Sequence, residues 1–423
     1  MNSSLVLVPL AMKSLWNRRG TAFLTVLSLA MGVALILGVE NLRQGARTGF
    51  ANTISGTDLV VGARTGSINL LLYSVFRVGN ATNNVSWSAY RKLARHRDVE
   101  WAIPLSLGDS HRGFRVIGTD RAYFQHYRYG LRQTLEFASG NPFSDLFDVV
   151  LGAEVARALD YDPGDEIVVS HGLGEIGTQD HADRPFTVSG VLAPTGTPVD
   201  HGLYVSLGGI EAMHIDWRQG TRRPGLAISP DRLRRLDLEP KEVTAVLVGL
   251  KSRFAVFTLQ REINDEKSEP LMAILPGVAL QELWDLMRNV EWALSAIAGL
   301  VALSAVLGML AMLLAGLSER RREIAILRSV GARPWQVFFL FTLEALVLVV
   351  IGILVGLALL QLAYLGAGSW LEAAYGIRLE SIALNWNNLV YLSAILFAGF
   401  LSGLLPSYAA YRRSLTDGLV LRI

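Results

Sequence analysis

Four long apolar stretches constrain what this chain of 423 residues can fold into. Each is about as long as the ~20 mostly apolar residues that an α-helix needs to cross a bilayer. Roughly 250 residues of mixed composition separate the first stretch from the second, and the other three follow one another closely. We therefore expect an α-helical four-span membrane protein with a large α+β domain between its first and second helices. The stretches cover about 21–38, 290–317, 337–366 and 389–409.

The composition supports a membrane protein and excludes several other classes. Hydrophobic residues make up 51% and charged residues 18% of the chain, whereas soluble domains carry roughly 25% charged residues. The formal net charge of +2 provides no broad basic field for nucleic acid. Because the chain has no cysteine, it can form no disulfide, thiolate metal site or cysteine nucleophile.

Arginine and lysine in the short flanking segments predict the orientation of the four helices. Such residues accumulate on the cytoplasmic side of a membrane. The loop between the third and fourth helices has only Arg378, beside Glu372 and Glu380. We therefore expect both termini in the cytoplasm and the large domain outside. The cytoplasmic cations would be Lys13, Arg18, Arg19, Arg320, Arg321, Arg322, Arg328, Arg333, Arg412, Arg413 and Arg422.

The first apolar stretch has two interpretations, a cleaved signal peptide or an uncleaved anchor. Its apolar run is longer than that of a typical signal peptide, and no clear small-x-small cleavage site follows it. An uncleaved anchor is therefore expected. Just before it, residues 8–17 place apolar side chains on one helical face, which predicts a short amphipathic helix along the membrane.

The segment between the second and third apolar stretches has the pattern of a separate helix. Ile324, Leu327 and Val330 recur at helical spacing among arginines. Gly331 stands where a helix C-cap requires positive φ, and Pro334 can begin the next helix. A loop that only orients the protein needs neither feature, whereas a helix that binds in a groove of a partner uses both.

These segments resemble ABC-transporter permeases of the FtsX and MacB type. The resemblance implies a dimer of permeases, or a pair with a paralogous permease, together with two ATPase subunits that bind ATP and Mg²⁺. It implies a bacterial inner-membrane location, a periplasmic core domain, and a coupling helix that carries ATP-driven closure to that domain. A periplasmic or outer-membrane partner fits the same family. The similar segments are residues 10–39, 317–356 and 399–419 for the membrane part, and 86–104, 149–169 and 186–200 for the periplasmic part.

The resemblance also implies roles for particular residues. Small side chains four residues apart allow close helix contacts, and in this family they suggest a dimer interface in the first two membrane helices. The ATPase-coupling residues would be Glu319, Arg322, Glu323, Ile324, Leu327, Arg328, Val330 and Gly331; the dimer interface would include Ser28, Gly32, Ala34, Gly38, Ser304 and Gly308.

We expect no catalytic, cofactor or metal site in this chain. A phosphate-binding P-loop needs G-x-x-x-x-G-K-[ST], and none of the five lysines follows a glycine. ATP hydrolysis is therefore expected in a partner chain, and this chain is expected to be a non-catalytic subunit. His171, His181 and His201, with Asp180, Asp183 and Asp200, could gather around a metal, but their spacing matches no known signature and favours solvated loop residues.

Three further features carry expectations for the fold. Residues 58–107 and 243–275 each suggest strand–helix–strand units of a membrane-proximal subdomain, with stalks at 40–50 and 278–290. Residues 108–230 suggest a β-rich insertion. Glu344, ~14 Å into the third apolar helix, is expected to make an interhelical contact.

A short apolar segment, Ile68 to Phe76, allows two interpretations. It is expected on a loop, either packed in the core of the outward domain or exposed as a contact for partner or cargo. The contact residues would be Leu71, Leu72 and Phe76.

The leading functional hypothesis is a permease that transmits ATP-driven motion to export or extract a lipoprotein, a lipid or a small hydrophobic molecule. The alternative is an ATPase-coupled regulator of an extracytoplasmic enzyme such as a cell-wall hydrolase. The expected segments are the amphipathic helix 1–20, transmembrane helix 21–40, periplasmic domain 41–284, stalk end and transmembrane helix 285–317, coupling helix 318–333, transmembrane helix 334–366, periplasmic loop 367–388, transmembrane helix 389–410 and cytoplasmic tail 411–423.

Overall fold

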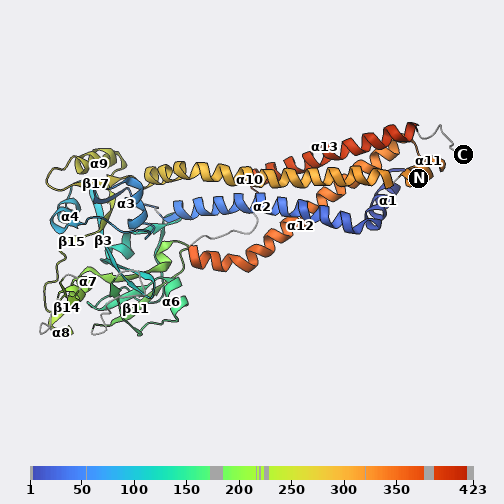
Figure 1. The fold of residues 1–423 in the computed structure, drawn as a ribbon. Coiled ribbons are helices and arrows are strands. Elements are labelled where there is room, and N and C mark those ends of the chain that lie inside the picture. The colour runs from blue at the N-terminus through green and yellow to red at the C-terminus, as the bar shows by residue number, and fades with distance from the viewer. Residues whose placement is uncertain are drawn as a thin grey trace. The chain divides into compact units, whose positions relative to one another are not determined.

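The computed structural model describes residues 3–53, 55–171, 184–215, 217–218, 221–222, 228–319, 321–375 and 385–416. The chain divides into two compact units, each with its own core (Figure 1). We call them the helical unit and the αβ unit. The helical unit comprises Met1–Gly45, Arg288–Glu372 and Arg378–Ile423, and the αβ unit comprises Ala46–Met287 and Ala373–Ile377.

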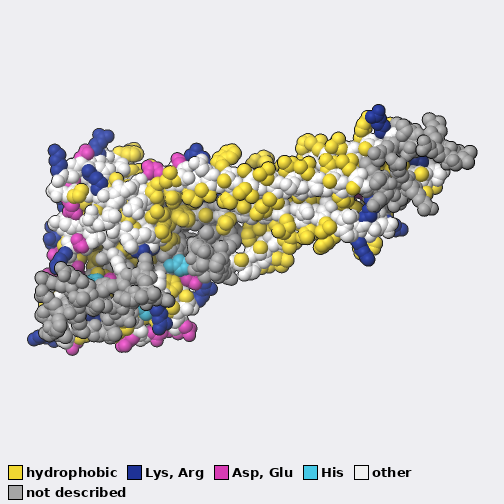
Figure 2. All heavy atoms as spheres, viewed as in Figure 1, with side chains coloured by type: hydrophobic (Ala, Val, Ile, Leu, Met, Phe, Trp, Pro, Cys, Tyr) yellow, Lys and Arg dark blue, Asp and Glu magenta, His cyan; other side chains and the backbone are white. Residues whose placement is uncertain are grey.

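Within the part of the chain that the structure describes, four helices are long and apolar enough to cross a membrane, which confirms the expected architecture. On the face shown in Figure 2, hydrophobic side chains cover the middle of these helices, and Lys and Arg gather at the end where α1 and α11 lie. The four long helices are α2 (Arg19–Thr53), α10 (Pro276–Glu319), α12 (Pro334–Tyr375) and α13 (Trp386–Thr416), and the two short ones are α1 (Ser3–Asn17) and α11 (Arg321–Ser329).

Glycines allow the long helices of the helical unit to approach one another closely. A Cβ atom on Gly356 of α12 would lie 2.8 Å from the carbonyl oxygen of Ala30 in α2, and one on Gly352 would lie 2.7 Å from Leu29 Cβ. Such close approach strengthens van der Waals packing, which drives helix association in lipid. The core around them includes Leu29, Val33, Leu37, Met309, Leu313, Leu348, Val349 and Ile395.

The αβ unit is built on one large mixed sheet with the strand order β17-β1-β16-β3-β4-β12-β8-β11-β7. Its strands lie where apolar runs alternate with turn residues. The strands are β1 (Leu59–Ala63), β3 (Val99–His111), β4 (Phe114–Thr119), β7 (Phe137–Gly140), β8 (Asp148–Leu151), β11 (Phe186–Leu192), β12 (Gly202–Ser206), β16 (Ala245–Leu250) and β17 (Leu271–Ile274); β9 (Glu166–Ile167) and β10 (Ser170–His171) pair at its side.

The strand–helix–strand expectation at both ends of this unit is confirmed. Helix α4 (Trp87–Ala94) precedes β3, and helix α9 (Val256–Asn264) lies between β16 and β17. Ser86 caps α4, because its hydroxyl accepts a hydrogen bond of 3.2 Å from the backbone N–H of Ala89. Tyr90, Leu93, Leu259 and Ile263 from these helices pack in one core cluster with the strands.

The middle segment is rich in strands, as expected, but its main strands do not form a separate sheet. Strand β3 pairs with β16 through residues 99–105 and continues to pair with β4 through residues 106–111. Strands β4, β12, β8 and β11 then extend the same sheet. A single long strand therefore joins the two halves of the αβ unit, and β3 carries both pairings because its 13 residues exceed the usual strand length.

Candidate functional site

The segment between α10 and α12 forms a short helix with a defined end. Helix α11 covers Arg321–Ser329, and Gly331 adopts φ = 98° immediately after it. The N–H of Gly331 donates to the carbonyl of Arg328 at 3.0 Å, and the N–H of Ala332 donates to the carbonyl of Leu327 at 2.9 Å. This pair of bonds is the Schellman arrangement. The predicted glycine C-cap is confirmed.

The next helix restarts as the sequence indicates. Pro334 is the first residue of α12. The N–H of a first residue has no partner within the helix, so proline costs no hydrogen bond at this position. The side chain of Gln336 accepts a hydrogen bond of 2.8 Å from the backbone N–H of Arg333. The two caps fix the directions in which the chain leaves α11 and enters α12.

The expected apolar stripe on α11 needs correction. Ile324 is half-buried and packs against Val337, Phe341 and Ala410 of α12 and α13. Ile326 and Val330, four residues apart, are instead 55% and 83% exposed. A partner would meet the Ile326–Val330 face, because the opposite face closes the helical unit.

The remaining coupling residues are placed only in part. Leu327 and Arg328 are half-buried, and the Arg328 guanidinium donates to the carbonyl of Ala332 at 3.5 Å. The side chains of Glu319, Arg322 and Glu323 lie outside the described residues.

A polar network joins three helices of the helical unit. Arg43 of α2 donates to the carboxylate of Glu40 at 2.7 Å and lies 3.6 Å from Glu291 of α10. The side-chain amide of Asn387 in α13 donates to the same Glu40 at 3.0 Å. Glu40 is buried. A buried carboxylate is costly unless it is paired and hydrogen-bonded, so these partners hold α13 against α2. We call Glu40, Arg43, Glu291 and the asparagines Asn41, Asn385, Asn387 and Asn388 the polar clamp.

The ends of α2 and α10 that belong to the αβ unit are held by aromatic packing. The ring of Phe50 in α2 lies 4.4 Å from Phe76 and 5.5 Å from Trp284 in α10. The guanidinium of Arg47 lies 5.4 Å from the Trp284 ring centroid, a cation–π distance. We call Phe50, Phe76 and Trp284 the aromatic joint.

The last carbonyls of α2 are also bonded. The hydroxyl of Tyr127 donates to the carbonyl of Thr53 at 2.7 Å, and the N–H of Gly130 donates to the carbonyl of Asn52 at 2.8 Å. Helix C-termini leave carbonyls without partners in the helix. The middle segment of the αβ unit therefore supplies the cap of α2.

The apolar segment that was expected on a loop is helix α3 (Ser67–Ser74). Leu71 is fully buried, Phe76 is buried, and Leu72 is partly buried against the same core cluster. The core interpretation therefore fits this segment. The contact hypothesis is corrected for Leu71 and Phe76, because buried side chains have no surface to offer a partner.

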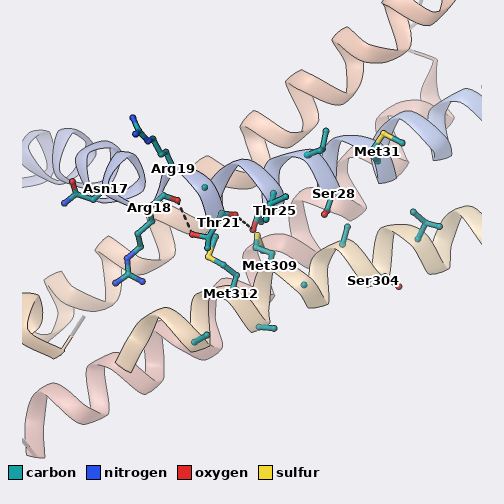
Figure 3. A pocket seen from close by; sticks show the side chains of 18 residues that line it. Asn17, Arg18, Arg19, Thr21, Thr25, Ser28, Met31, Ser304, Met309 and Met312 are labelled. Carbon is teal, nitrogen blue, oxygen red and sulfur yellow. Dashed lines mark hydrogen bonds between the residues drawn. The ribbon is translucent and has the colours of Figure 1, made fainter. Parts of the chain in front are cut away.

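The residues expected at a dimer interface separate into two groups. A Cβ on Gly32 would lie 3.2 Å from Ala302 Cα, and one on Gly38 would lie 3.4 Å from Leu360 Cδ1, so both glycines serve contacts within the chain. Ala34 packs against the helical core. Ser28, Ser304 and Gly308 instead line a groove that remains open to the surface (Figure 3).

The histidine and aspartate candidates do not assemble around a metal in the part of the chain that the structure describes. Both oxygens of Asp200 accept hydrogen bonds from the N–H of Thr195, at 2.9 and 3.0 Å, and thereby fix a turn. His201 stacks on Phe114, and burial lowers the pKa of its imidazole. The side chain of His171, together with His181, Asp180 and Asp183, lies outside the described residues.

Glu344 is fully buried in α12. Two residues earlier, the hydroxyl of Thr342 donates to the hydroxyl of Ser407 in α13 at 3.0 Å, and Ser407 donates to the carbonyl of Gly403 at 2.7 Å. Polar contact between α12 and α13 is thus present beside Glu344, and it favours a packing role for this region.

Sequence reasoning missed the polar clamp and the Ile326–Val330 face. One signal for the clamp was available: Glu40 directly follows an apolar stretch, and asparagines at 385, 387 and 388 directly precede another. Ionisable residues at such depths are usually paired inside the helix bundle.

Known proteins resemble the chain over most of its length. The family model of the MacB-like periplasmic core domain matches residues 22–266, and that of the FtsX-like permease C-terminal region matches residues 295–415. The macrolide export ATP-binding/permease protein MacB of Nitrobacter winogradskyi is 24% identical over 413 residues, which cover 92% of this chain and 56% of the relative. The protein of the same name from Azoarcus sp. is 24% identical over 353 residues, which cover 79% of this chain and 48% of the relative.

The chain thus spans about half the length of the curated relatives it matches. Among solved structures, the periplasmic region of MacB from Actinobacillus actinomycetemcomitans aligns with a TM-score of 0.35 and 12% identity, over 55% of this chain and 94% of that one.

Proposed function

Because the chain belongs to the family of ABC-transporter permeases with a MacB-like periplasmic core domain and an FtsX-like C-terminal region, we propose that it transmits ATP-driven motion to its αβ unit. The ATP would be hydrolysed, with Mg²⁺, by nucleotide-binding subunits that dock on α11. The αβ unit would lie in the periplasm, both termini in the cytoplasm, and the four apolar helices in the inner membrane. This chain would itself be non-catalytic.

Helix α11 is the observation that carries this proposal. It is a nine-residue helix capped by Gly331 and followed at once by the Pro334 start of α12. Ile324 anchors one face to the helical unit, while Ile326 and Val330 remain exposed on another. An exposed apolar pair on a rigidly held short helix has the form of an anchor for a groove in a partner. A force applied to α11 would reach α12 and α13 through the Ile324 contacts.

Transmission would proceed along continuous helices. Helix α2 has 35 residues and α10 has 44, so they are about 52 and 66 Å long at 1.5 Å per residue. The chain passes from α2 into β1 within six residues, and from β17 into α10 within two. Strands β1 and β17 pair directly with each other. Movement of either helix would therefore act on two neighbouring strands of one sheet.

The cargo that we propose is a small hydrophobic molecule, and a lipid or a lipoprotein is the alternative. The two curated relatives are named for macrolide export, and that name supports export of a small molecule. By analogy with the family we propose two ATPase subunits, a second permease as an identical or paralogous copy, and a periplasmic or outer-membrane partner.

Association with the ATPase tests the proposal. Ile326→Asp combined with Val330→Asp should weaken co-purification of the ATPase at least tenfold, because a loss of about 1.4 kcal/mol already has that effect. Ser329→Asp adds a charge to the same helix without removing an apolar contact and serves as the matched control. Undiminished co-purification and ATP turnover in the double variant would overturn the role of α11.

A further inference from the structure

Arg77 of the αβ unit combines a strained backbone with a buried and incompletely bonded charge. It follows helix α3 and adopts φ = 62°, in the left-handed region that residues other than glycine rarely enter. Its Nε and Nη1 atoms are buried, and neither has a hydrogen-bond acceptor within the part of the chain that the structure describes. Each of these features raises the free energy of the folded state.

The surroundings of Arg77 do little to offset its charge. Its Nη2 donates to the hydroxyl of Tyr123 at 3.4 Å, close to the limit of a hydrogen bond. A tyrosine hydroxyl, unlike a carboxylate, offers a cation no opposite charge. Another cation lies nearby, because Arg115 of β4 donates to the carbonyl of Gly79 at 2.6 Å and to Asn80 Oδ1 at 3.2 Å. Burial, and then the charge of Arg77, lower the pKa of the Arg115 guanidinium.

Three buried tyrosines form a stack beside Arg77. Tyr123, in helix α5 (Ala122–His126), stacks on Tyr127 and on Tyr204 of β12, with 4.9 Å between ring centroids in both pairs. The hydroxyl of Tyr123 donates to that of Tyr204 at 3.3 Å, and Tyr204 donates to the carbonyl of Val199 at 3.0 Å. We call Tyr123, Tyr127 and Tyr204 the tyrosine stack. Its own hydrogen bonds are complete without Arg77.

The end of α2 that belongs to the αβ unit contacts this arrangement at two points. The ring of Phe50 lies 4.4 Å from that of Phe76, the residue before Arg77. The carbonyl of Thr53 accepts the hydrogen bond from Tyr127 of the tyrosine stack at 2.7 Å. A shift of this end of α2 therefore acts both on the segment that carries Arg77 and on the stack that receives its hydrogen bond.

The residues after Arg77 lie at the surface. Val78 is 57% exposed, and Gly79 and Asn80 are exposed as well. The backbone N–H of Val78 donates to the carbonyl of Leu72 at 3.0 Å and so ties this segment to α3. Because its neighbours already face water, a local rotation of the backbone at Arg77 would carry the guanidinium out of the stack and into solvent.

We propose that Arg77 is a metastable latch, held against the tyrosine stack in this state and released to the surface when the end of α2 moves. The latch deepens the proposed function and rests on it, since movement of α2 is what would release it. Strained residues persist only where the surrounding structure holds them, and they gather at switch regions. The free energy stored at Arg77 would favour the released state, so that a small shift of α2 suffices to change the αβ unit.

An anion that supplies acceptors to Arg77 is the competing explanation. Burial of Nε and Nη1 leaves these atoms no accessible surface for a ligand in this state. The structure therefore favours release of the side chain over binding of an anion beside it.

The melting temperature of the full-length chain in detergent tests the stored free energy. Arg77→Met removes the charge, keeps a similar length and retains the positive φ. It should raise the melting temperature by at least ~3 °C, because an apolar side chain in place of a buried ion often stabilises a protein. Arg132→Met, at φ = 63° but at an exposed position, should leave it unchanged.

Two outcomes of this measurement would overturn the latch. A lower melting temperature of Arg77→Met would show that the buried cation stabilises the folded state. A rise in the melting temperature of the parent chain on addition of inorganic phosphate, lost in Arg77→Met, would show that an anion is its partner.

Hydrogen exchange tests the link to α2. Phe50→Ala, which removes the contact with α2, should speed exchange of the Val78 amide about tenfold, because release of Arg77 breaks its bond to Leu72. Adding Arg77→Met should restore slow exchange, since the stored free energy is gone, whereas a cavity left by Phe50 would persist. Phe254→Ala, on the surface of the αβ unit, should leave exchange unchanged.

Exchange that stays slow in Phe50→Ala, or that stays fast in the double variant, contradicts the latch. Neither measurement involves the ATPase. A failure of the ATPase to associate with α11 would overturn the proposed function, and these two measurements would still decide whether Arg77 is a latch.

Discussion

The side-chain amide of Asn388 in α13 donates a hydrogen bond of 3.0 Å to the side-chain oxygen of Asn41 in α2, across 347 positions of sequence. Asn388 is almost fully buried. Asn385 donates similarly to Gln44 at 2.9 Å. Each bond ties the beginning of α13 to α2 near the Glu40 carboxylate. The polar clamp therefore fixes which turn of α13 meets which turn of α2.

Removing the Asn41–Asn388 bond should loosen the helical unit measurably. Asn388→Ala should lower the free energy of unfolding by about 1–2 kcal/mol, because it leaves the half-buried side-chain oxygen of Asn41 in α2 without this partner. In a double-mutant cycle with Asn41→Ala we expect a coupling energy of about 0.6 kcal/mol, typical of such bonds between membrane helices. Unfolding of the detergent-solubilised chain measures both. Ser393→Ala, at an exposed position on the same helix, should leave the free energy of unfolding unchanged. A coupling energy of zero would show that the Asn41–Asn388 bond does not stabilise the helical unit.

The aromatic joint should couple helix movement to the αβ unit. Phe50→Ala or Trp284→Ala removes ring contacts worth about 0.5–1.5 kcal/mol beyond their buried area. We expect ATP turnover to persist while transport falls, because the ATPase site is untouched and only the connection is weakened. Phe254→Ala, at a side chain 96% exposed in the αβ unit, is the control. Parallel loss of turnover and transport in Phe50→Ala would contradict a purely transmitting role.

Substitutions at two adjacent leucines of α3 should differ sharply in their effect on stability. Leu71→Ser should cost about 3 kcal/mol or more, because it loses transfer free energy and leaves a cavity in the core. Leu72→Ser should cost clearly less, because that side chain is only partly buried. Thermal unfolding of the two variants makes the comparison. Equal melting temperatures of the two variants would contradict the burial of Leu71 in the core.

Two aspartates predict pH effects of opposite sign. Burial raises the pKa of the Asp120 carboxyl to about 6, while the hydrogen bond from Arg234 lowers the pKa of Asp145. For Asp120, the unfolded chain binds fewer protons than the folded chain between the ordinary value of about 3.9 and 6, so stability falls as pH rises through that window. For Asp145, stability is present above the ordinary value and lost as pH falls through the lowered one.

Asparagine variants expose this difference. Asp120→Asn should gain at least ~3 °C in melting temperature, relative to the parent chain, between pH 4.5 and pH 7.5. When the pH rises from acid to neutral, the melting temperature of Asp145→Asn should fall relative to that of the parent chain. A gain in both variants, or in neither, would contradict the opposite shifts in pKa of the two carboxyl groups.

The proposed orientation can be read with single cysteines. Val330→Cys and Phe254→Cys are highly exposed, one on the α11 segment and one in the αβ unit. A membrane-impermeant maleimide added to intact spheroplasts should label Phe254→Cys only, and permeabilisation should expose Val330→Cys. Labelling of Val330→Cys in intact spheroplasts would reverse the topology.

Local sequence patterns predicted the long apolar helices and the helix end at Gly331. The apolar stretches predicted the membrane-spanning helices, and Gly331 predicted the end of α11, because length, hydropathy and a positive φ are properties of short segments. The expected stripe on α11 failed at Ile324 for a different reason. Periodicity shows that a face is apolar, but only Phe341 and Ala410, later in the chain, decide which side is covered.

Contacts between residues far apart in the sequence could not be predicted from local patterns. No local pattern joins Asn41 to Asn388, and none shows that β3 pairs with both β16 and β4. The buried position of Leu71 likewise depends on strands and helices distributed over the whole αβ unit. Each of these contacts brings together residues whose proximity is set by the complete fold.

The pairing of β1 with β16 and β17 has a consequence for synthesis of the chain. Leu59–Ala63 emerges early, but its neighbours lie near the other end of the unit, β16 about 180 residues later and β17 about 210 residues later. At ~5–20 residues per second, β1 waits roughly 10–40 s with both edges open. An unpaired apolar strand is a template for wrong partners. In the orientation proposed above, the αβ unit should therefore depend on a holding chaperone on the periplasmic side until Ile274 has been translocated and the sheet can close.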